Sequence, residues 1–257
     1  ELERVRSKFG NASIFGGSYG WSSAGRMHHA RTLIHRFMGA IGGCTGQVTN
    51  YSYGAAMRLL PHIFGDDRTA AGPVTDWWAI LEHCQEFVAF GGIASKNWQI
   101  QSGGAGLHPF DDFMAEAARR GIRFTNVSPL RSDTEAVIAA DWLQIRPGTD
   151  MALILALAHV VHASGKTDMA FVNRYCVGFD RFEAYLMGRV DGTPKSPEWA
   201  SEITGIAVET IVEFAHRLIG RRVMLSAAWS LQRAEHGEQP YWGLATLAAM
   251  LGQIGLP

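Results

Sequence analysis

The sequence predicts an α/β fold in which a Rossmann-like parallel sheet is flanked by helices. Four short apolar runs have the length and composition of buried strands. Each run is followed by Gly, Ser or Pro and then by a helical pattern, and this alternation is typical of a parallel sheet covered by helices. The expected strands are residues 12–15, 87–90, 122–127 and 223–227.

Helical periodicity is clearest in three segments. Apolar residues recur at helical spacing over residues 27–41, and the Gly-Gly pair that follows is expected to end this helix because glycine adopts left-handed geometry without steric cost. Residues 150–163 and 208–219 are the other two helices, and Ser196 is a good N-cap between them. We therefore expect a helical subdomain, inserted at about residues 150–220, to interrupt the sheet.

Composition excludes several classes of protein. The 257 residues include 23 basic and 24 acidic side chains, so the chain lacks the excess positive charge on which nucleic-acid binding depends. The longest apolar stretch, residues 151–163, is shorter than the roughly 20 residues of a membrane span. Three cysteines with no close pair argue against a disulfide framework and against a Cys-rich metal site.

Residues 16–20 match the G-x-S-x-G pattern of a hydrolase nucleophile elbow, with Ser18 as the nucleophile. An elbow needs a helix that begins directly after the serine, whereas this sequence stays irregular until about Arg26. It also needs earlier strands and an oxyanion loop, and little chain precedes Ser18. A serine hydrolase is therefore an alternative and not the main prediction.

Two segments, one after an expected strand and one before an expected helix, carry groups that suit anions and polar rings. The strand at 122–127 runs into Ser128 and a segment rich in hydroxyls with one arginine, and a helix start there has free N–H groups that can hold a phosphate. Gly148, Thr149 and Asp150 precede the helix at 150–163; a hydroxyl and a carboxylate there can bind the N–H edge of a ring. The same residues are also good helix caps, and both interpretations stay open.

Three motifs in one order resemble a known family. Residues 15–21 (Phe-Gly-Gly-Ser-Tyr-Gly-Trp), 50–56 (Asn-Tyr-Ser-Tyr-Gly-Ala-Ala) and 146–150 (Arg-Pro-Gly-Thr-Asp) are similar to the dimethyl sulfoxide, trimethylamine N-oxide and biotin sulfoxide reductases of the bis(molybdopterin guanine dinucleotide) superfamily. The resemblance continues through residues 191–195, 198–200, 229–233, 236–239 and 252–257.

The resemblance implies a molybdenum-dependent oxidoreductase that transfers an oxygen atom from an S-oxide or N-oxide to Mo(IV). The dithiolene sulfurs of two pterins and one protein oxygen hold the metal, and Ser52 occupies the ligand position; an alkoxide is a hard donor that suits a high-valent metal. Tyr19 and Trp21 match the family's active-site pair, whose O–H and N–H groups can donate to the transferred oxygen. Because trimethylamine N-oxide reductases tend to lack this tyrosine, Tyr19 favours a sulfoxide substrate.

The family's contacts to Mo-bis(molybdopterin guanine dinucleotide) also carry over by position. They fall on Lys96, Asn97, Val127, Ser128, Gly148, Thr149, Asp150, Trp229, Ser230 and Arg233. Three departures are visible: Asn50 stands where relatives usually carry Asp, Tyr53 where Thr is common, and residues 92–95 replace the usual Asp-Pro-containing turn. The changed turn at residues 92–95 weakens the assignment of Lys96 and Asn97 as cofactor contacts most.

The resemblance also implies the protein's wider organisation. Residues 1–65 are expected to form a first α/β segment with the active-site loop and Ser52, and residues 66–257 a Rossmann-like dinucleotide-binding region. We expect the chain to be a central fragment of a larger multidomain molybdoenzyme that takes electrons from a c-type cytochrome or a reductase. A periplasmic and a cytoplasmic location both stay open. A non-catalytic nucleotide-binding or interaction module of the same fold is a further alternative.

Overall fold

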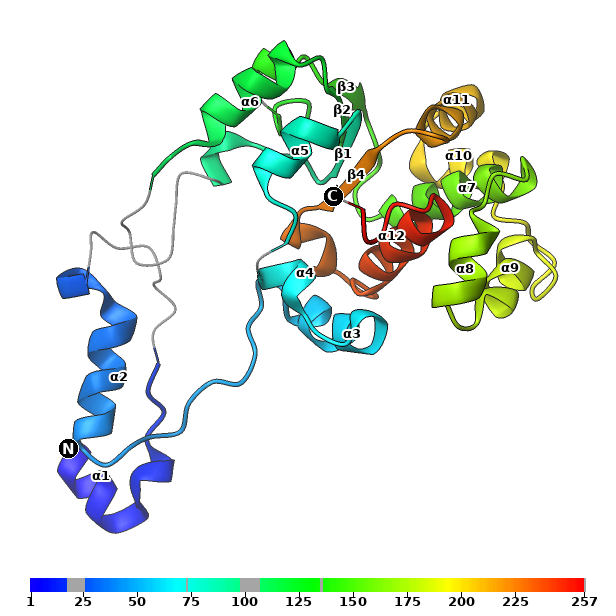
Figure 1. Cartoon of the computed structure of the whole chain (residues 1–257). Coiled ribbons are helices and arrows are strands. Elements are labelled where there is room, and N and C mark those ends of the chain that lie inside the picture. The colour runs from blue at the N-terminus through cyan, green and yellow to red at the C-terminus, as the bar shows by residue number, and fades with distance from the viewer. Residues whose placement is uncertain (18–25, 73, 98–106, 135, 257) are drawn as a thin grey trace. The chain divides into compact units, whose positions relative to one another are not determined.

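The computed structural model describes residues 1–17, 26–72, 74–97, 107–134 and 136–256, and Figure 1 follows them along the chain. These residues form two compact units. Unit 1 comprises Glu1–Asn50 and Ser95–Asp111, and unit 2 comprises Tyr51–Ala94 and Asp112–Pro257. The sequence suggests a domain boundary near residue 65, and this boundary stays a prediction.

A parallel sheet forms the centre of unit 2. Its strands are β1 (Glu86–Phe90), β2 (Arg123–Val127), β3 (Asp141–Leu143) and β4 (Val223–Ala227), and their order across the sheet is β3-β2-β1-β4. Phe90 at the end of β1 pairs in register with Val127 of β2 on one side and with Ala227 of β4 on the other. The parallel sheet is therefore confirmed, as are the strands expected at 87–90, 122–127 and 223–227, whereas β3 was not expected.

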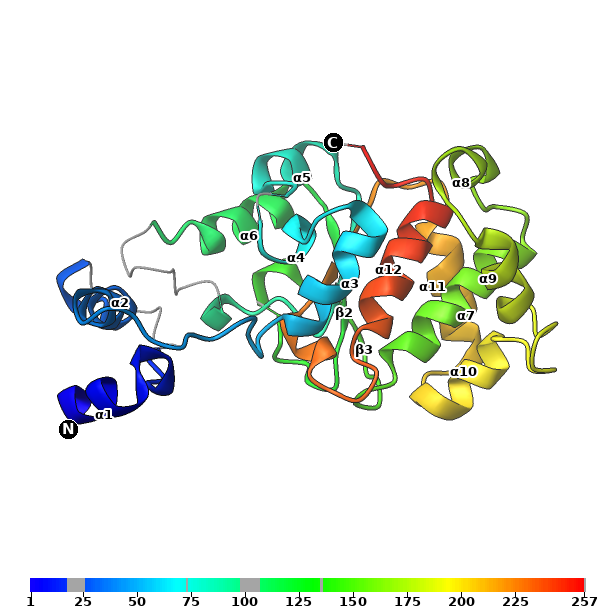
Figure 2. The same ribbon diagram turned by 90° about the horizontal axis from the view of Figure 1, so that it is seen from below.

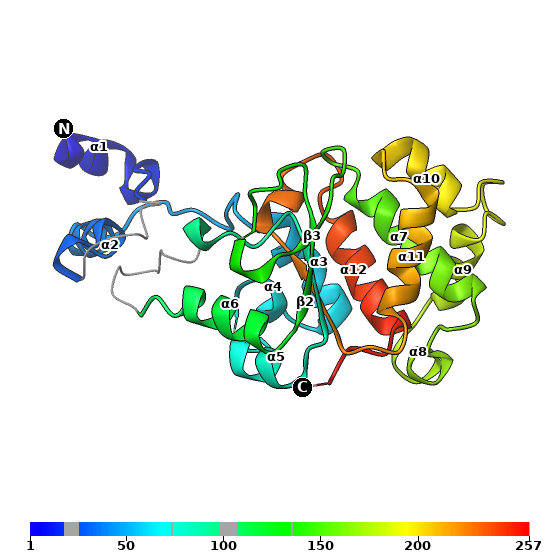
Figure 3. The same cartoon turned by 90° about the horizontal axis from the view of Figure 1, so that it is seen from above.

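Helices cover both faces of this sheet, as Figures 2 and 3 show, and β1 is accordingly buried at every position. One face carries α5 (Trp77–His83) and α6 (Phe110–Arg119). The Trp77 ring stacks with its centroid 5.7 Å from that of Phe87 and 5.9 Å from that of Phe113. Aromatic side chains from a strand and two helices thus form the core on this face.

On the side of the opposite face lie the helices between β3 and β4 and the helix after β4. They are α7 (Asp150–Ala163), α8 (Met169–Tyr175), α9 (Phe179–Leu186), α10 (Pro197–Thr204), α11 (Val208–Leu218) and α12 (Gln239–Met250). α7 packs against α10, α11 and α12, which explains why it is apolar around most of its circumference. The helical insertion is confirmed, and the Ser196 hydroxyl accepts a hydrogen bond from the Trp199 amide at 3.4 Å, as an N-cap does.

Unit 2 also contains shorter elements near the ends of its strands. They are α3 (Gly54–Phe64), α4 (Arg68–Ala71) and 3-10 helices at Ala136–Ile138 and Trp229–Gln232. Helix α3 packs against α12 and against the 3-10 helix Trp229–Gln232. Across the described part of the chain, no helix combines the length and the apolar character that a bilayer crossing needs.

Unit 1 is helical. It contains α1 (Leu2–Phe9), α2 (Ala30–Ala40) and 3-10 helices at Asn11–Ser13, Arg26–His28 and Ser95–Asn97. Helix α2 confirms the helix expected over 27–41, and the chain leaves it through Gly42 and Gly43, whose φ angles are 101° and 103°. Glycine is required there because such angles are strained for other residues.

The strand expected at residues 12–15 is wrong. Asn11–Ser13 form a 3-10 helix, and Phe15 makes only an isolated bridge to Thr45. The reason lies in the polar side chains before the apolar run: the Asn11 amide donates to the Gly43 carbonyl at 2.8 Å, and the Ser13 hydroxyl donates to the Gly10 carbonyl at 2.7 Å. Such bonds from short polar side chains to the backbone compete with strand pairing.

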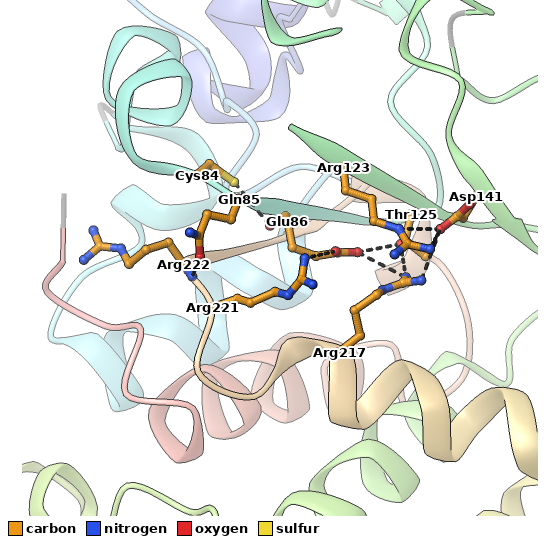
Figure 4. A network of polar contacts seen from close by, with 9 residues as sticks. All are labelled: Cys84, Gln85, Glu86, Arg123, Thr125, Asp141, Arg217, Arg221 and Arg222. Atoms are coloured by element: carbon orange, nitrogen blue, oxygen red, sulfur yellow. Dashed lines mark hydrogen bonds and ion pairs between the residues drawn. The ribbon is translucent and has the colours of Figure 1, made fainter. Parts of the chain in front are cut away.

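A partly buried polar network joins the amino ends of the strands to α11, as Figure 4 shows. The Arg217 guanidinium lies 3.1 Å from the Glu86 carboxylate and donates to the Thr125 hydroxyl at 2.6 Å. The same guanidinium donates to Asp141 at 3.1 Å, and Arg123 donates to Asp141 at 2.8 Å. The network therefore ties β1, β2 and β3 to one helix, at the edge of the sheet opposite to the loops described next.

Candidate functional site

The carboxyl ends of the four strands bring together most of the residues that the sequence singled out. Val127 ends β2 and Ser128 follows it, while Gly148, Thr149 and Asp150 lie where the chain passes from β3 into α7. Trp229 and Ser230 lie in the 3-10 helix that follows β4, and Arg233 is its C-cap. In open α/β sheets, ligands bind outside this edge of the sheet, which makes it the candidate site.

The loops at this edge are held to one another through backbone groups. The Gly91 amide donates to the Val127 carbonyl at 2.8 Å, and the Ala228 amide donates to the Phe90 carbonyl at 2.8 Å. The loops after β1, β2 and β4 are thereby fixed relative to one another.

Two glycines permit this close approach. Gly91 and Gly92 have φ angles of 80° and 83°. A Cβ at Gly91 would lie 2.8 Å from the Cβ of Ala228, and one at Gly92 would lie 2.6 Å from the Asp133 carbonyl oxygen. Segment 92–95, which departs from the family pattern, therefore begins with a glycine that its contacts require.

Ser128 is buried and its hydroxyl is engaged within its own loop. The hydroxyl donates to the Asp133 carboxylate at 2.8 Å and accepts from the Leu130 amide at 3.1 Å, and the Ser128 carbonyl accepts from the Trp142 indole at 2.9 Å. These bonds fix the turn after β2. Ser128 therefore shapes the loop through its side chain.

Asn126 is a residue that the sequence reasoning missed. It is fully buried, its side-chain amide donates to the Leu130 carbonyl at 3.3 Å, and its Oδ1 has no hydrogen-bond partner within the described residues. Asparagine is depleted in strands, so its position inside β2 was the signal that could have marked it. An unsatisfied buried acceptor at a strand end is a candidate contact for a bound donor.

The turn before α7 combines a glycine, a hydroxyl and a buried carboxyl group. Gly148 has a φ angle of 76°, and the Thr149 hydroxyl donates to the Arg146 carbonyl at 2.7 Å. Burial raises the pKa of Asp150, and the hydrogen bond from its own backbone amide opposes this only in part. The Arg146 guanidinium donates to the Glu202 carbonyl at 2.6 Å, so it closes the end of α10 and not the site. A carboxyl group at this helix start suits the N–H edge of a ring better than a phosphate.

The segment with Ser52 lies against the loop after β4. Ser52 is half-buried and precedes α3, and the ring of its neighbour Tyr53 lies 4.5 Å from the Trp229 ring, centroid to centroid. The Gln232 carboxamide, also overlooked in the sequence, accepts a hydrogen bond from the Ala56 amide at 2.9 Å. The candidate metal ligand and one group of the predicted dinucleotide contacts therefore lie side by side in unit 2.

The other predicted residues are placed differently. Lys96 and Asn97 belong to unit 1, where they lie exposed in a 3-10 helix. Ser18, Tyr19 and Trp21 lie outside the described residues.

The sequence model of one protein family, described as molybdopterin oxidoreductase, matches residues 1–257. The chain belongs to this family. It is 46% identical over its full length to the biotin sulfoxide reductase of Cereibacter sphaeroides, covering 34% of that protein. It is 40% identical to the trimethylamine-N-oxide reductase of Haemophilus influenzae and 40% identical to the dimethyl sulfoxide/trimethylamine N-oxide reductase of Rhodobacter capsulatus, covering 31% of each. The chain thus spans about a third of the length of these family members.

A solved structure shares the fold. The acetylene hydratase from Pelobacter acetylenicus superposes with a TM-score of 0.62 at 25% sequence identity, over 99% of this chain and 32% of that one. The α/β fold with its parallel sheet is therefore that of a segment of a larger molybdoenzyme. Because a hydratase also has this fold, the fold alone does not identify the reaction that a protein with this fold catalyses.

Proposed function

We propose that the protein is a molybdenum-dependent reductase that removes an oxygen atom from an S-oxide or an N-oxide, with bis(molybdopterin guanine dinucleotide) as its cofactor. Three relatives at 40–46% identity, named for sulfoxides or N-oxides, support the reaction class. The observation that carries the proposal is that Ser52 and three groups of predicted cofactor contacts belong to one sheet-based unit, with the Ser52 segment packed against the loop after β4.

The residues of unit 2 fit such a cofactor. Ser52 offers a hard oxygen donor, which suits molybdenum in a high oxidation state. Asn126 leaves a buried acceptor at the same edge of the sheet, and Asp150 offers a carboxyl group at a helix start. We infer that Ser52 would hold the metal and that the loops after β2, β3 and β4 would hold the dinucleotides.

When bound, the cofactor supplies two-electron chemistry and accepts the oxygen atom. The chain's own residues bind and orient. The Trp229 ring and the Arg233 guanidinium, both in the segment after β4, are a stacking surface and a cation for a nucleotide. We propose that Tyr19 and Trp21 donate hydrogen bonds to the substrate oxygen as negative charge develops on it.

The preferred substrate class is a sulfoxide. The tyrosine at position 19 supports this choice, and so does the 46% identity to a biotin sulfoxide reductase. We propose that Lys96 and Asn97 also contact the cofactor, and that an electron-donor protein, a c-type cytochrome or a reductase, supplies the electrons for each turnover.

Elemental analysis and turnover of the full-length protein test the proposal. We expect about one molybdenum per chain and reduction of sulfoxides, and we expect the Ser52→Ala variant to lose turnover because the metal loses its protein ligand. Ser164→Ala, which alters an exposed serine after α7, is the matched control and is expected to keep full activity.

Two results would refute the proposal. A mature preparation without molybdenum would support the non-catalytic module instead. Labelling of Ser18 by a fluorophosphonate, together with esterase activity that is lost in a Ser18→Ala variant, would support the serine hydrolase.

A further inference from the structure

Gln232 is a buried polar residue for which the proposed chemistry has no role. It ends the 3-10 helix that follows β4, and only 6% of its surface is exposed. A buried carboxamide needs hydrogen bonds on both its oxygen and its nitrogen to offset its desolvation. The partners of Gln232 therefore indicate what it holds in place.

The oxygen of Gln232 binds the start of α3. Oε1 accepts a hydrogen bond from the Ala56 backbone amide at 2.9 Å. Ala56 is the third residue of α3, and its amide is one of the N–H groups at a helix start that have no acceptor within the helix. Because the N-cap position holds Tyr53 and not a Ser, Thr, Asp or Asn, the capping oxygen comes from a residue 176 positions away in the sequence.

The nitrogen of Gln232 is fixed on the other side. Nε2 donates to the Tyr241 hydroxyl at 3.2 Å, and that hydroxyl donates to the Ala228 carbonyl at 3.1 Å. The Ala228 amide in turn donates to the Phe90 carbonyl at the end of β1. A continuous chain of hydrogen bonds thus runs from the central strand, through Gln232, to the first turn of α3.

This chain ends next to the candidate metal ligand. Ser52 precedes the α3 N-cap by one residue, so an anchor on the first turn of α3 also restrains the Ser52 backbone. The Tyr53 ring, 4.5 Å from the Trp229 ring, supplies a second contact between the same two segments. Two independent contacts therefore fix the Ser52 segment relative to the loop that carries Trp229 and Ser230.

We propose that Gln232 is a positioning residue that caps α3 and so sets where the Ser52 oxygen lies relative to the cofactor-binding loop after β4. This inference rests on the proposed role of Ser52 as the metal ligand. Gln232 itself does not touch substrate or metal. Its effect is on the geometry of the ligand, which a reacting metal centre tolerates poorly when it shifts by about 1 Å.

The test uses the full-length protein and three variants. Gln232→Leu removes the capping oxygen with little change in volume, and Gln232→Glu keeps an oxygen for the Ala56 amide. Gln253→Leu is the matched control, because the Gln253 side-chain oxygen likewise accepts a backbone amide, that of Val223, at 2.9 Å, but at the amino end of β4. Hydrogen exchange of the α3 amides, the Mo(V) paramagnetic resonance spectrum and the kinetic constants are recorded for each.

We expect Gln232→Leu to speed exchange of the Ala56 amide about tenfold, to shift the Mo(V) signal and to lower kcat with a smaller effect on KM. Gln232→Glu is expected to restore slow exchange at Ala56 and most of the kcat. Gln253→Leu is expected to leave the α3 exchange and the Mo(V) signal as in the unmodified protein.

The outcomes separate the two proposals. If Ser52→Ala changes the Mo(V) signal while Gln232→Leu changes neither that signal nor kcat, Gln232 does not position the ligand. If Ser52→Ala leaves the signal unchanged, the proposed ligand is wrong, and the exchange of Ala56 still reports whether Gln232 caps α3. Should Gln232→Leu not fold, Tyr241→Phe replaces it: this variant removes the partner of Nε2, and the same direction of change is required of it.

Discussion

The Arg217 guanidinium lies 3.1 Å from the carboxylate of Glu86, a side chain with no exposed surface, at the amino end of β1. The other Glu86 oxygen has no hydrogen-bond partner within the described residues, and Arg221 lies 3.9 Å from it. Removing the close guanidinium is strongly destabilising, because the carboxylate charge then stays buried without its partner. The ion pair thus makes the sheet's amino edge sensitive to single substitutions (Figure 4).

Arg217→Met tests this dependence. We expect the variant to lose about 3 kcal/mol of unfolding free energy, because Glu86 would stay buried without its close partner. Arg119→Met is the control, since Arg119 pairs with Glu116 on the exposed surface of α6, where such pairs contribute less than about 1 kcal/mol. If urea unfolding showed equal losses of unfolding free energy for the two variants, the buried ion pair would contribute no more to stability than the exposed one.

Gly92→Ala probes the interlocked loops at the carboxyl edge. A methyl group there meets both a positive φ angle and the Asp133 backbone, whereas at Gly220, where φ is 73°, it meets open space. We expect Gly220→Ala to cost about 1 kcal/mol for the backbone angle alone and Gly92→Ala to cost about 1–3 kcal/mol more. If both variants unfolded at the same denaturant concentration, the close approach of Gly92 to the Asp133 backbone would have no effect on stability.

Alkaline pH should weaken the fold through Tyr241. Burial raises the pKa of Tyr241 to about 12, against 10.0 for an exposed tyrosine. Between these values the unfolded chain releases the phenolic proton and the folded chain keeps it, so stability falls as pH rises. Between about pH 9 and pH 11, the unfolding free energy of the unmodified protein should fall by about 1 kcal/mol more than that of the Tyr241→Phe variant. Parallel pH profiles for the two proteins would contradict the raised pKa.

The strands that coincide with mainly apolar runs were the predictable part of the fold. β1 and β4 are apolar apart from Glu86 and Ser226, and β2 carries the buried Phe124 and Val127, because helices cover both faces of the sheet at these strands. β3 is three residues long, begins with Asp141 and lies at the edge of the sheet, so its sequence carries no comparable pattern. Residues 12–15 show the converse error, since this run forms only an isolated bridge between Phe15 and Thr45 and no strand.

The candidate site was predictable where it follows a strand directly. Ser128 directly follows an expected strand and Thr149 directly precedes an expected helix, and parallel strands bring their ends to one edge. The Gln232–Ala56 contact had no such local signal, because 176 positions separate the two residues and only the packing of α3 joins them. The assignment of Ser52 as the proposed metal ligand came from the resemblance alone, since nothing around Ser52 in the sequence marks a serine as a ligand.

X-ray absorption at the molybdenum edge of the full-length protein is the measurement that tests the central claim most directly. We predict a metal surrounded by sulfur ligands and by a protein oxygen, and the contribution of that oxygen should disappear in Ser52→Ala and persist in Ser164→Ala. Absence of molybdenum, or an oxygen contribution that is the same with and without the Ser52 hydroxyl, would contradict the account.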